Sequence, residues 1–373
     1  MGQGSRCRDA HGGWTAVAAW RSTTKIDTQR ERECPNVKTG KFGAAVVAAS
    51  AAVMLIVSGC SSDSAGSASR TEIKTLRIGT IGSGNTLSGP LGFANSQNKI
   101  IPALADLGVE NIEIFSFPNG PDLNQALVAG ELDVANYGDT PALVAKGSGL
   151  DTRLLAVTAF DNNAGVVAKD PSITSLKDLE GKKIGVPSGS YIDRYLQGAL
   201  AEEGVTAELI HLYPADQEAP LNSSEIDAAA LPDVNPSASL HAFLAKGFHQ
   251  IDSVYDNHRD LAGTSASVSS GEFLEANPDF GLAWQQLLTA SGKYARENWD
   301  DYLAYEIEQS NFDPDIVRGA ANPDSIAEEP FPPAAVDLLT GTKQFLVDRG
   351  NIREDFELTE WFYDADASEN EGE

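Results

Sequence analysis

The chain has 373 residues, with 27 Lys and Arg against 54 Asp and Glu, which gives a formal net charge of −27. That length is enough for two domains with hydrophobic cores of ordinary size. The strongly acidic composition argues against nucleic acid and anionic lipid surfaces as partners, because both require basic patches.

The first 59 residues have the layout of an export signal. An apolar run at 42–57 (FGAAVVAASAAVMLIV) follows two lysines and precedes a Ser-Gly-Cys sequence. A secretory signal needs a cationic flank, a short apolar core and small residues at the cleavage site. About 16 residues are fewer than a spanning helix needs, so a marginal membrane anchor is the less favoured alternative. Residues 1–36 exceed the length of a signal flank, which favours a later translation start at Val37.

The tetrad at 57–60 (VSGC) resembles a bacterial lipobox, in which the cysteine is acylated and becomes the first residue. Acyl chains on Cys60 would anchor the protein to the outer face of the cell membrane; an ordinary free cysteine is the alternative. Residues 60–73 are rich in Ser, Gly and Ala and predict a flexible tether. After residue 59 the chain carries 19 basic and 50 acidic residues, and Cys60 is its only cysteine, so no internal disulfide is expected.

Residues 74–162 alternate β-rich and helical segments, which predicts an α/β sheet with helices on both faces. The helical segments have apolar residues at helical spacing and each ends at a glycine. Buried parallel strands are expected at 75–81, 111–117, 132–137 and 152–160.

A second series of the same kind covers residues 163–258, so two similar lobes are expected. Its strands are expected at 182–186, 207–213, 226–231 and 251–255. The part from 259 to 363 returns to the first lobe and becomes mostly helical after about Ser270, and these helices are expected to pack on that lobe. The acidic tail at 364–373 is expected to be disordered.

Three loops that follow expected strands are candidate ligand sites, because ligands of α/β sheets bind beyond the carboxyl ends of the strands. Free N–H groups at the helix N-termini there suit anions, whereas a carboxylate would pair with a ligand amine. An ordinary turn or helix cap is the alternative for each loop. The candidates are Asn85 and Thr86 in GSGNT, Asp139 and Thr140 in GDTP, and Ser188, Gly189 and Ser190 in PSGSY.

Catalytic and metal motifs are not found in the sequence. The histidines after residue 59 have no metal-ligand spacing, and the chain contains no HExxH, CxxC, GxSxG or Walker sequence. We therefore expect no enzyme activity, no cofactor and no metal.

Five stretches carry a resemblance to a known family: GSGNTLSGP, LVAGELDVANYGDTPALVAKGSG, VVAKDPSITSLKDLEGKKIGVPSGS, IDAAALPDVNP and GEFLEANPDF. On these stretches the chain from about residue 75 to 363 resembles the sulfonate-, taurine- and nitrate-binding proteins of ABC importers. The resemblance implies a type II periplasmic binding protein fold, with two doubly wound α/β lobes joined by a two-strand hinge and C-terminal helices on the first lobe. The hinge crossings would lie near 161–165 and 257–264.

The resemblance also implies which residues line the cleft between the lobes. It includes the seven candidates above and adds Asp233, although Pro232 and Val234 flank it where the family commonly has an aromatic residue and then Asp-Pro. The matched loops contain no arginine, and Arg194 is the nearest cation. A zwitterion such as taurine therefore suits the cleft at least as well as a bare oxyanion.

The implied function is that of a lipid-anchored, extracytoplasmic and monomeric binding component that passes a small sulfonate or taurine-like solute to ABC permease subunits. Nitrate or another small molecule is the alternative ligand. A rival enzyme of the same fold that makes a pyrimidine precursor is disfavoured, because it uses a cysteine-rich iron site. A surface adhesin or sensor with a vestigial pocket is the remaining rival.

Overall fold

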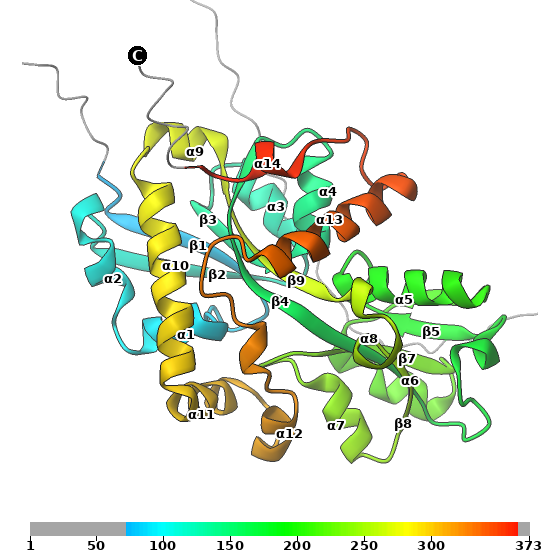
Figure 1. The fold of residues 1–373 in the computed structure, drawn as a ribbon. Coiled ribbons are helices and arrows are strands. Elements are labelled where there is room, and N and C mark those ends of the chain that lie inside the picture. The colour runs from blue at the N-terminus through cyan, green and yellow to red at the C-terminus, as the bar shows by residue number, and fades with distance from the viewer. Residues whose placement is uncertain (1–71, 365–373) are drawn as a thin grey trace, which may run out of the picture. The chain divides into compact units, whose positions relative to one another are not determined.

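The structure, a computed structural model, describes residues 72–364 (Figure 1). The predicted signal peptide, Cys60, most of the predicted tether and nearly all of the predicted acidic tail lie outside the described residues. Within this range no helix is both long enough and apolar enough to cross a membrane.

The first lobe is built on a mixed sheet. Strand β1 (Thr75–Ile81) lies between β2 (Asn111–Phe117) and β3 (Val134–Gly138) and is parallel to both. Strand β9 (Gly263–Ser270) pairs antiparallel with β3 and with the first part of β4 (Thr152–Ala168). The carboxyl ends of β1 and β3 therefore open at one edge, as expected for a ligand site.

The second lobe is built on the sheet that contains the remainder of β4. This part of β4 pairs antiparallel with β7 (Ala228–Asp233) and β8 (His249–Ser253). Strand β5 (Lys183–Val186) lies parallel to and between β7 and β6 (Glu208–His211). The two-lobed α/β fold predicted from the sequence is confirmed.

Strands β4 and β9 connect the lobes (Figure 1). In β4 the partner changes between Asn162, which pairs with Gly263 of β9, and Asn163, which pairs with Asp233 of β7. The predictions that the strand at 152–160 is parallel and ends there are wrong: β4 is antiparallel to all its partners and continues to Ala168. Strand β9 reads GTSASVSS, whose small residues lack the apolar alternation that would have predicted it.

Helices cover the sheets of both lobes. Those of the first lobe are α1 (Gly89–Ser96), α2 (Ile100–Ala103), η1 (Ala105–Leu107), α3 (Gly120–Val128) and α4 (Asp139–Lys146). Those of the second lobe are η2 (Leu176–Leu179), α5 (Tyr191–Glu203), η3 (Pro214–Asp216), α6 (Glu218–Ser223), α7 (Ser239–Ala245) and α8 (Val254–Asn257), and η4 (Arg259–Leu261) lies in the segment that returns to the first lobe. The C-terminal series is α9 (Gly271–Ala276), α10 (Phe280–Glu297), α11 (Trp299–Gln309), α12 (Pro314–Gly319), η5 (Pro323–Ser325), α13 (Pro333–Asp348) and α14 (Leu358–Trp361).

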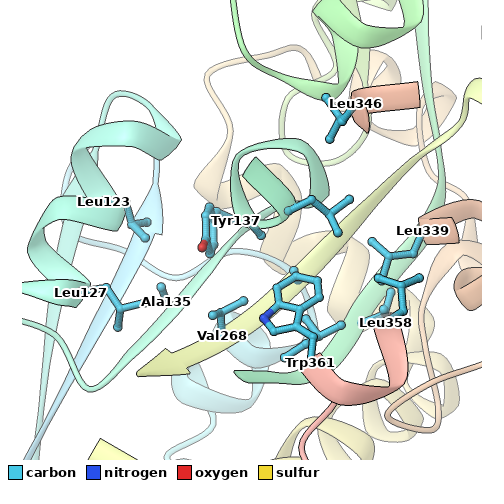
Figure 2. Packing of buried hydrophobic residues seen from close by; sticks show 14 of the residues in the cluster. Leu123, Leu127, Ala135, Tyr137, Val268, Leu339, Leu346, Leu358 and Trp361 are labelled. Carbon is cyan, nitrogen blue, oxygen red and sulfur yellow. The ribbon is translucent and has the colours of Figure 1, made fainter. Parts of the chain in front are cut away.

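Most of the C-terminal helices pack on the first lobe, as predicted, whereas α12 contacts α7 of the second lobe. On one face of its sheet, Leu339 of α13 and Trp361 of α14 join a buried cluster with Leu123 of α3 and Val268 of β9 (Figure 2). On the other face, Trp284 of α10 is fully buried in a cluster with the apolar residues of β1. Both faces of this sheet are therefore covered, and its open edge is left for the site.

Candidate functional site: a cleft between the two lobes

A cavity of about 980 Å³ lies between the lobes. From the first lobe it is lined by the loop after β1, the start of α1 and the end of β3, and from the second by the loops after β5 and β7. Pockets for small molecules have volumes of roughly 300 to 1,000 Å³. The cavity also has an aromatic lining, which includes Tyr191, Tyr213, Phe243, Tyr255, Trp299 and Tyr302.

The loop after β1 contributes Thr86 but not Asn85 to this cavity. Asn85 has a positive φ of 52° and is bonded to β2: its backbone N–H donates to Ser116 Oγ, and its Oδ1 accepts from the Ser116 N–H, both at 3.0 Å. The prediction that Asn85 lines the cleft is therefore corrected, because its side chain fastens the turn. Thr86 is exposed at the cavity wall.

Asp139 and Thr140 do not line the cavity either, which corrects the second pair of candidates. The Asp139 side chain is fully buried. Its Oδ2 accepts from the N–H (2.9 Å) and the hydroxyl (3.1 Å) of Thr264, and its Oδ1 accepts from the N–H and the hydroxyl of Thr140. Both carboxylate oxygens thus have protein partners, and Thr140 uses its hydroxyl on Asp139 and lines a second cavity of about 690 Å³.

The loop after β5 places Ser188, Gly189 and Ser190 on the cavity wall. Its N–H groups have protein acceptors: Ser188 N–H donates to His211 Nδ1 (3.1 Å), and Gly189 N–H donates to the Asp193 carboxylate (2.8 Å). Ser190 is the N-cap of α5, with its Oγ accepting from Asp193 N–H (3.2 Å) and donating to Pro187 O (2.6 Å). A carboxylate of the protein therefore already occupies this helix N-terminus.

The N-terminus of α1 is occupied in the same way. The fully buried carboxyl of Glu306, from α11, accepts from the first N–H of the helix, that of Gly89, at 2.9 Å. Burial raises the pKa of Glu306 to about 7, against the lowering effect of the bonds from Gly89 and Tyr302. The positive end of α1 is thus paired with an acidic group of the protein rather than left for a ligand anion.

Asp233, at the end of β7, lines the cavity from the second lobe. Its Oδ2 accepts from Asn163 Nδ2 (2.9 Å), and its Oδ1 lies 2.5 Å from His241 Nδ1. This hydrogen bond raises the pKa of His241. The carboxylate is held in place by both neighbours and can contribute negative charge at the cavity wall.

Two asparagines outside the predicted set complete the wall. Asn136 of β3 and Asn235 of the loop after β7 both line the cavity. Both polar side-chain atoms of Asn136 and the Oδ1 of Asn235 are buried and have no partner among residues 72–364. The only available signal for Asn136 was its place at the carboxyl end of an expected strand.

The charges on the wall are mostly negative. The acidic lining residues are Asp161, Glu218, Asp233 and Glu329, and Lys246 is the only Lys, Arg or His that lines the cavity within the described chain. Lys246 forms an ion pair with Glu218, with 2.5 Å between Nζ and Oε2. No group of three or more His, Cys, Asp or Glu between residues 72 and 364 is placed to hold a metal ion.

Comparison with known proteins agrees with the resemblance predicted from the sequence. Residues 105–279 match the family model described as NMT1/THI5 like. A protein of Escherichia coli (strain K12) named for binding aliphatic sulfonates is 33% identical over 129 residues, which are 33% of this chain and 40% of that protein. The chain thus spans less than half the length of that curated relative. A protein of Bacillus subtilis with the same name is 23% identical over 72% of this chain and 79% of its own length.

Solved structures share the fold. The periplasmic aliphatic sulphonate binding protein SsuA of Escherichia coli superposes with a TM-score of 0.62 at 20% identity, covering 78% of this chain and 97% of its own. The alkanesulfonate-binding protein SsuA of Xanthomonas axonopodis pv. citri, bound to MOPS, gives 0.64 at 19% identity over 79% and 99%. The desulfurization enzyme DSZB gives 0.60 at 18% identity over 80% and 100%. The fold is therefore confirmed, and it occurs in both binding proteins and an enzyme.

Proposed function

We propose that this protein is the extracytoplasmic solute-binding component of an ABC importer and captures a small sulfonate or taurine-like molecule in the cleft between its lobes. The observation that carries the proposal is the cavity of about 980 Å³, which is walled by strand and helix ends of both lobes. The relatives named for sulfonate binding support the ligand class. Nitrate remains the alternative ligand.

Closure of the lobes would supply the affinity. The lobes are joined by β4 and β9, and bending of such connections brings the two walls onto a ligand. Thr86 on one wall and Ser188 on the other offer hydroxyls to sulfonate oxygens, and closure removes those hydrogen bonds from water. The closed form would then dock on the permease subunits.

We also propose that acyl chains on Cys60 anchor the protein to the membrane, and that the protein is monomeric and extracytoplasmic. The lipobox-like tetrad and the apolar run before it support export and acylation. We also propose that residues 74–162 and 259–363 form the first lobe and that residues 163–258 form the second.

The proposal also includes the absence of catalysis, which separates it from the enzyme that shares the fold. The three cysteines of the chain, at positions 7, 34 and 60, precede the residues that form the cleft. Asp233 and His241 lie together near the cleft, but their hydrogen bond is part of a structural set with Asn163. The lack of a cysteine thiol among the cleft residues of the described chain favours a role in solute binding over catalysis.

A thermal-shift screen of the purified protein against sulfonates, nitrate, amino acids and thiamine precursors tests the proposal. A ligand at 100 times its dissociation constant adds about 2.7 kcal/mol to the free energy of unfolding. We expect taurine or an alkanesulfonate to raise the melting temperature. We also expect the amount of intact ligand to stay unchanged during the incubation. A screen in which only nitrate or thiamine precursors stabilise the protein would contradict the ligand class, and loss of the ligand with time would contradict a purely binding role.

A further inference from the structure

The fold does not explain the unpartnered amide of Asn136 on the cleft wall. Asn136 lies in β3, in register with Thr80 of β1 and Ser267 of β9. The Ser267 hydroxyl accepts a hydrogen bond from Trp284 Nε1 at 2.8 Å. Both Asn136 amide atoms remain buried without a partner in the part of the chain that the structure describes.

A buried amide of this kind destabilises the protein unless a ligand satisfies it, because folding removes its hydrogen bonds to water and returns none. An Asn side chain presents one acceptor oxygen beside one donor NH2 group. Its complement is a molecule with a donor and an acceptor close together. The cleft wall is where such a molecule would lie.

Three other features of the wall favour a ligand that brings N–H groups. The Oδ1 of Asn235, on the opposite lobe, is a second buried acceptor without a partner in the described chain. The lining carboxylates outnumber the single lining Lys246, which is itself paired. The helix N-termini that would bind a bare anion already hold Glu306 and Asp193.

We infer that Asn136 is a specificity-determining residue of the cleft and that its solute carries an N–H donor close to an acceptor oxygen, as an amino-substituted sulfonate does. The Asn136 Nδ2 donates to the sulfonate oxygen and its Oδ1 accepts from the amine. A plain alkanesulfonate satisfies only the first of these bonds. This inference rests on the proposed function, because it takes the cleft as the solute site.

Isothermal titration with taurine and ethanesulfonate tests this assignment, because the two probes differ by one amine. Wild-type protein is expected to bind taurine at least about 10-fold more tightly than ethanesulfonate. The difference is the effect of the one hydrogen bond from the taurine amine to Asn136 Oδ1, which ethanesulfonate cannot form. Asn136→Leu keeps the shape of the side chain and removes both amide atoms, so the ratio of the two Kd values is expected to fall towards one. The matched control is Asn222→Leu, since Asn222 of α6 is exposed and does not line the cavity, and it is expected to keep the wild-type ratio.

The ligand-free variants give a second readout. Since the Asn136 amide has no protein partner, Asn136→Leu is expected to melt at or above the wild-type temperature. A melting temperature several degrees lower would show that the amide holds the fold together and would overturn the inference. Sulfonate binding with an unchanged Kd ratio in Asn136→Leu would also overturn it, while leaving the proposed function intact. Failure of the wild type to bind any sulfonate would contradict the proposed function and this inference together.

Discussion

Asp139 of the first lobe and Arg194 of the second form a buried ion pair, with 3.8 Å between Oδ2 and Nη2 and side chains that are 0% and 1% exposed. Both side chains also hold the segment that returns from the second lobe to the first. Asp139 accepts from Thr264, and Arg194 donates to the carbonyl oxygens of Leu261 and Ala262 at 3.2 and 2.9 Å. Asp139 was predicted to contact the ligand and Arg194 to lie near the site, whereas the two side chains stabilise the hinge.

Asp139→Asn is expected to destabilise the whole protein. The change leaves the Arg194 guanidinium buried without its carboxylate and places an NH2 group against N–H and hydroxyl donors. Breaking a buried pair in this way costs about 3 to 5 kcal/mol, far more than loss of a helix cap. Urea unfolding measures the loss in the free energy of unfolding, and Asp337→Asn, on the exposed surface of α13, is the control. A loss below about 1 kcal/mol would contradict the hinge role.

Ser190→Ala is expected to affect stability more than ligand binding. The hydroxyl caps α5 and donates to Pro187 O, so its proton is not available to a ligand. Loss of a serine cap costs about 1 kcal/mol. Thermal unfolding of the variant and titration with taurine separate the two effects. A drop in affinity of more than about 10-fold with unchanged stability would show that Ser190 donates to the ligand instead.

Glu306→Gln is expected to change how stability depends on pH. The pKa of Glu306 is raised by burial from 4.5 to about 7 in the folded protein, so the folded state holds a proton that the unfolded state releases. The stabilisation from this proton is fully present below pH 4.5 and is lost as the pH rises to about 7. Within that window each pH unit costs about 1.4 kcal/mol at most.

Urea unfolding of the wild type and of Glu306→Gln at several pH values between 4.5 and 8 measures this contribution. The free energy of unfolding of the wild type, relative to that of the variant, is expected to fall across the window and to level off above pH 7. A constant difference between the two proteins would contradict the raised pKa. Glu308→Gln, on the same helix, is the control for the loss of one acidic residue.

Cys60→Ala is expected to release the protein from the membrane, because acyl chains at this position would anchor it after cleavage of the signal. Fractionation of cells that produce the variant measures it, with Ser61→Ala as the control that keeps the cysteine. Retention of leader-free Cys60→Ala in the membrane fraction would contradict the lipobox interpretation.

Local sequence predicted much of the fold. The strands β1 and β2 begin and end at the predicted residues, since each alternates apolar and polar residues between turn signals. Helix α5 was predicted from its apolar spacing and the glycine that ends it. Strand β9 has only small residues, and it forms because β3 and β4 both pair with it, which is a long-range effect.

The site was less predictable than the fold, because contacts between residues far apart in the sequence determine it. Whether a loop carboxylate faces the cleft or the hinge depends on partners far along the chain, and Asp139 binds Thr264 across 125 positions. The occupation of the α1 N-terminus by Glu306 depends on a residue 217 positions away. Thr86, Ser188 and Asp233 were predicted at the cavity wall and lie there, because the carboxyl ends of strands meet at one edge of a sheet. Their contact with a ligand stays a prediction.

A crystal structure of the protein grown with saturating taurine would show whether the cleft is the solute site. Electron density for one taurine is expected in the cavity between β1, β3, β5 and β7, with the amine and a sulfonate oxygen within hydrogen-bond distance of the Asn136 amide. Density for taurine elsewhere, or an empty cavity in crystals of protein shown by titration to be saturated, would contradict it.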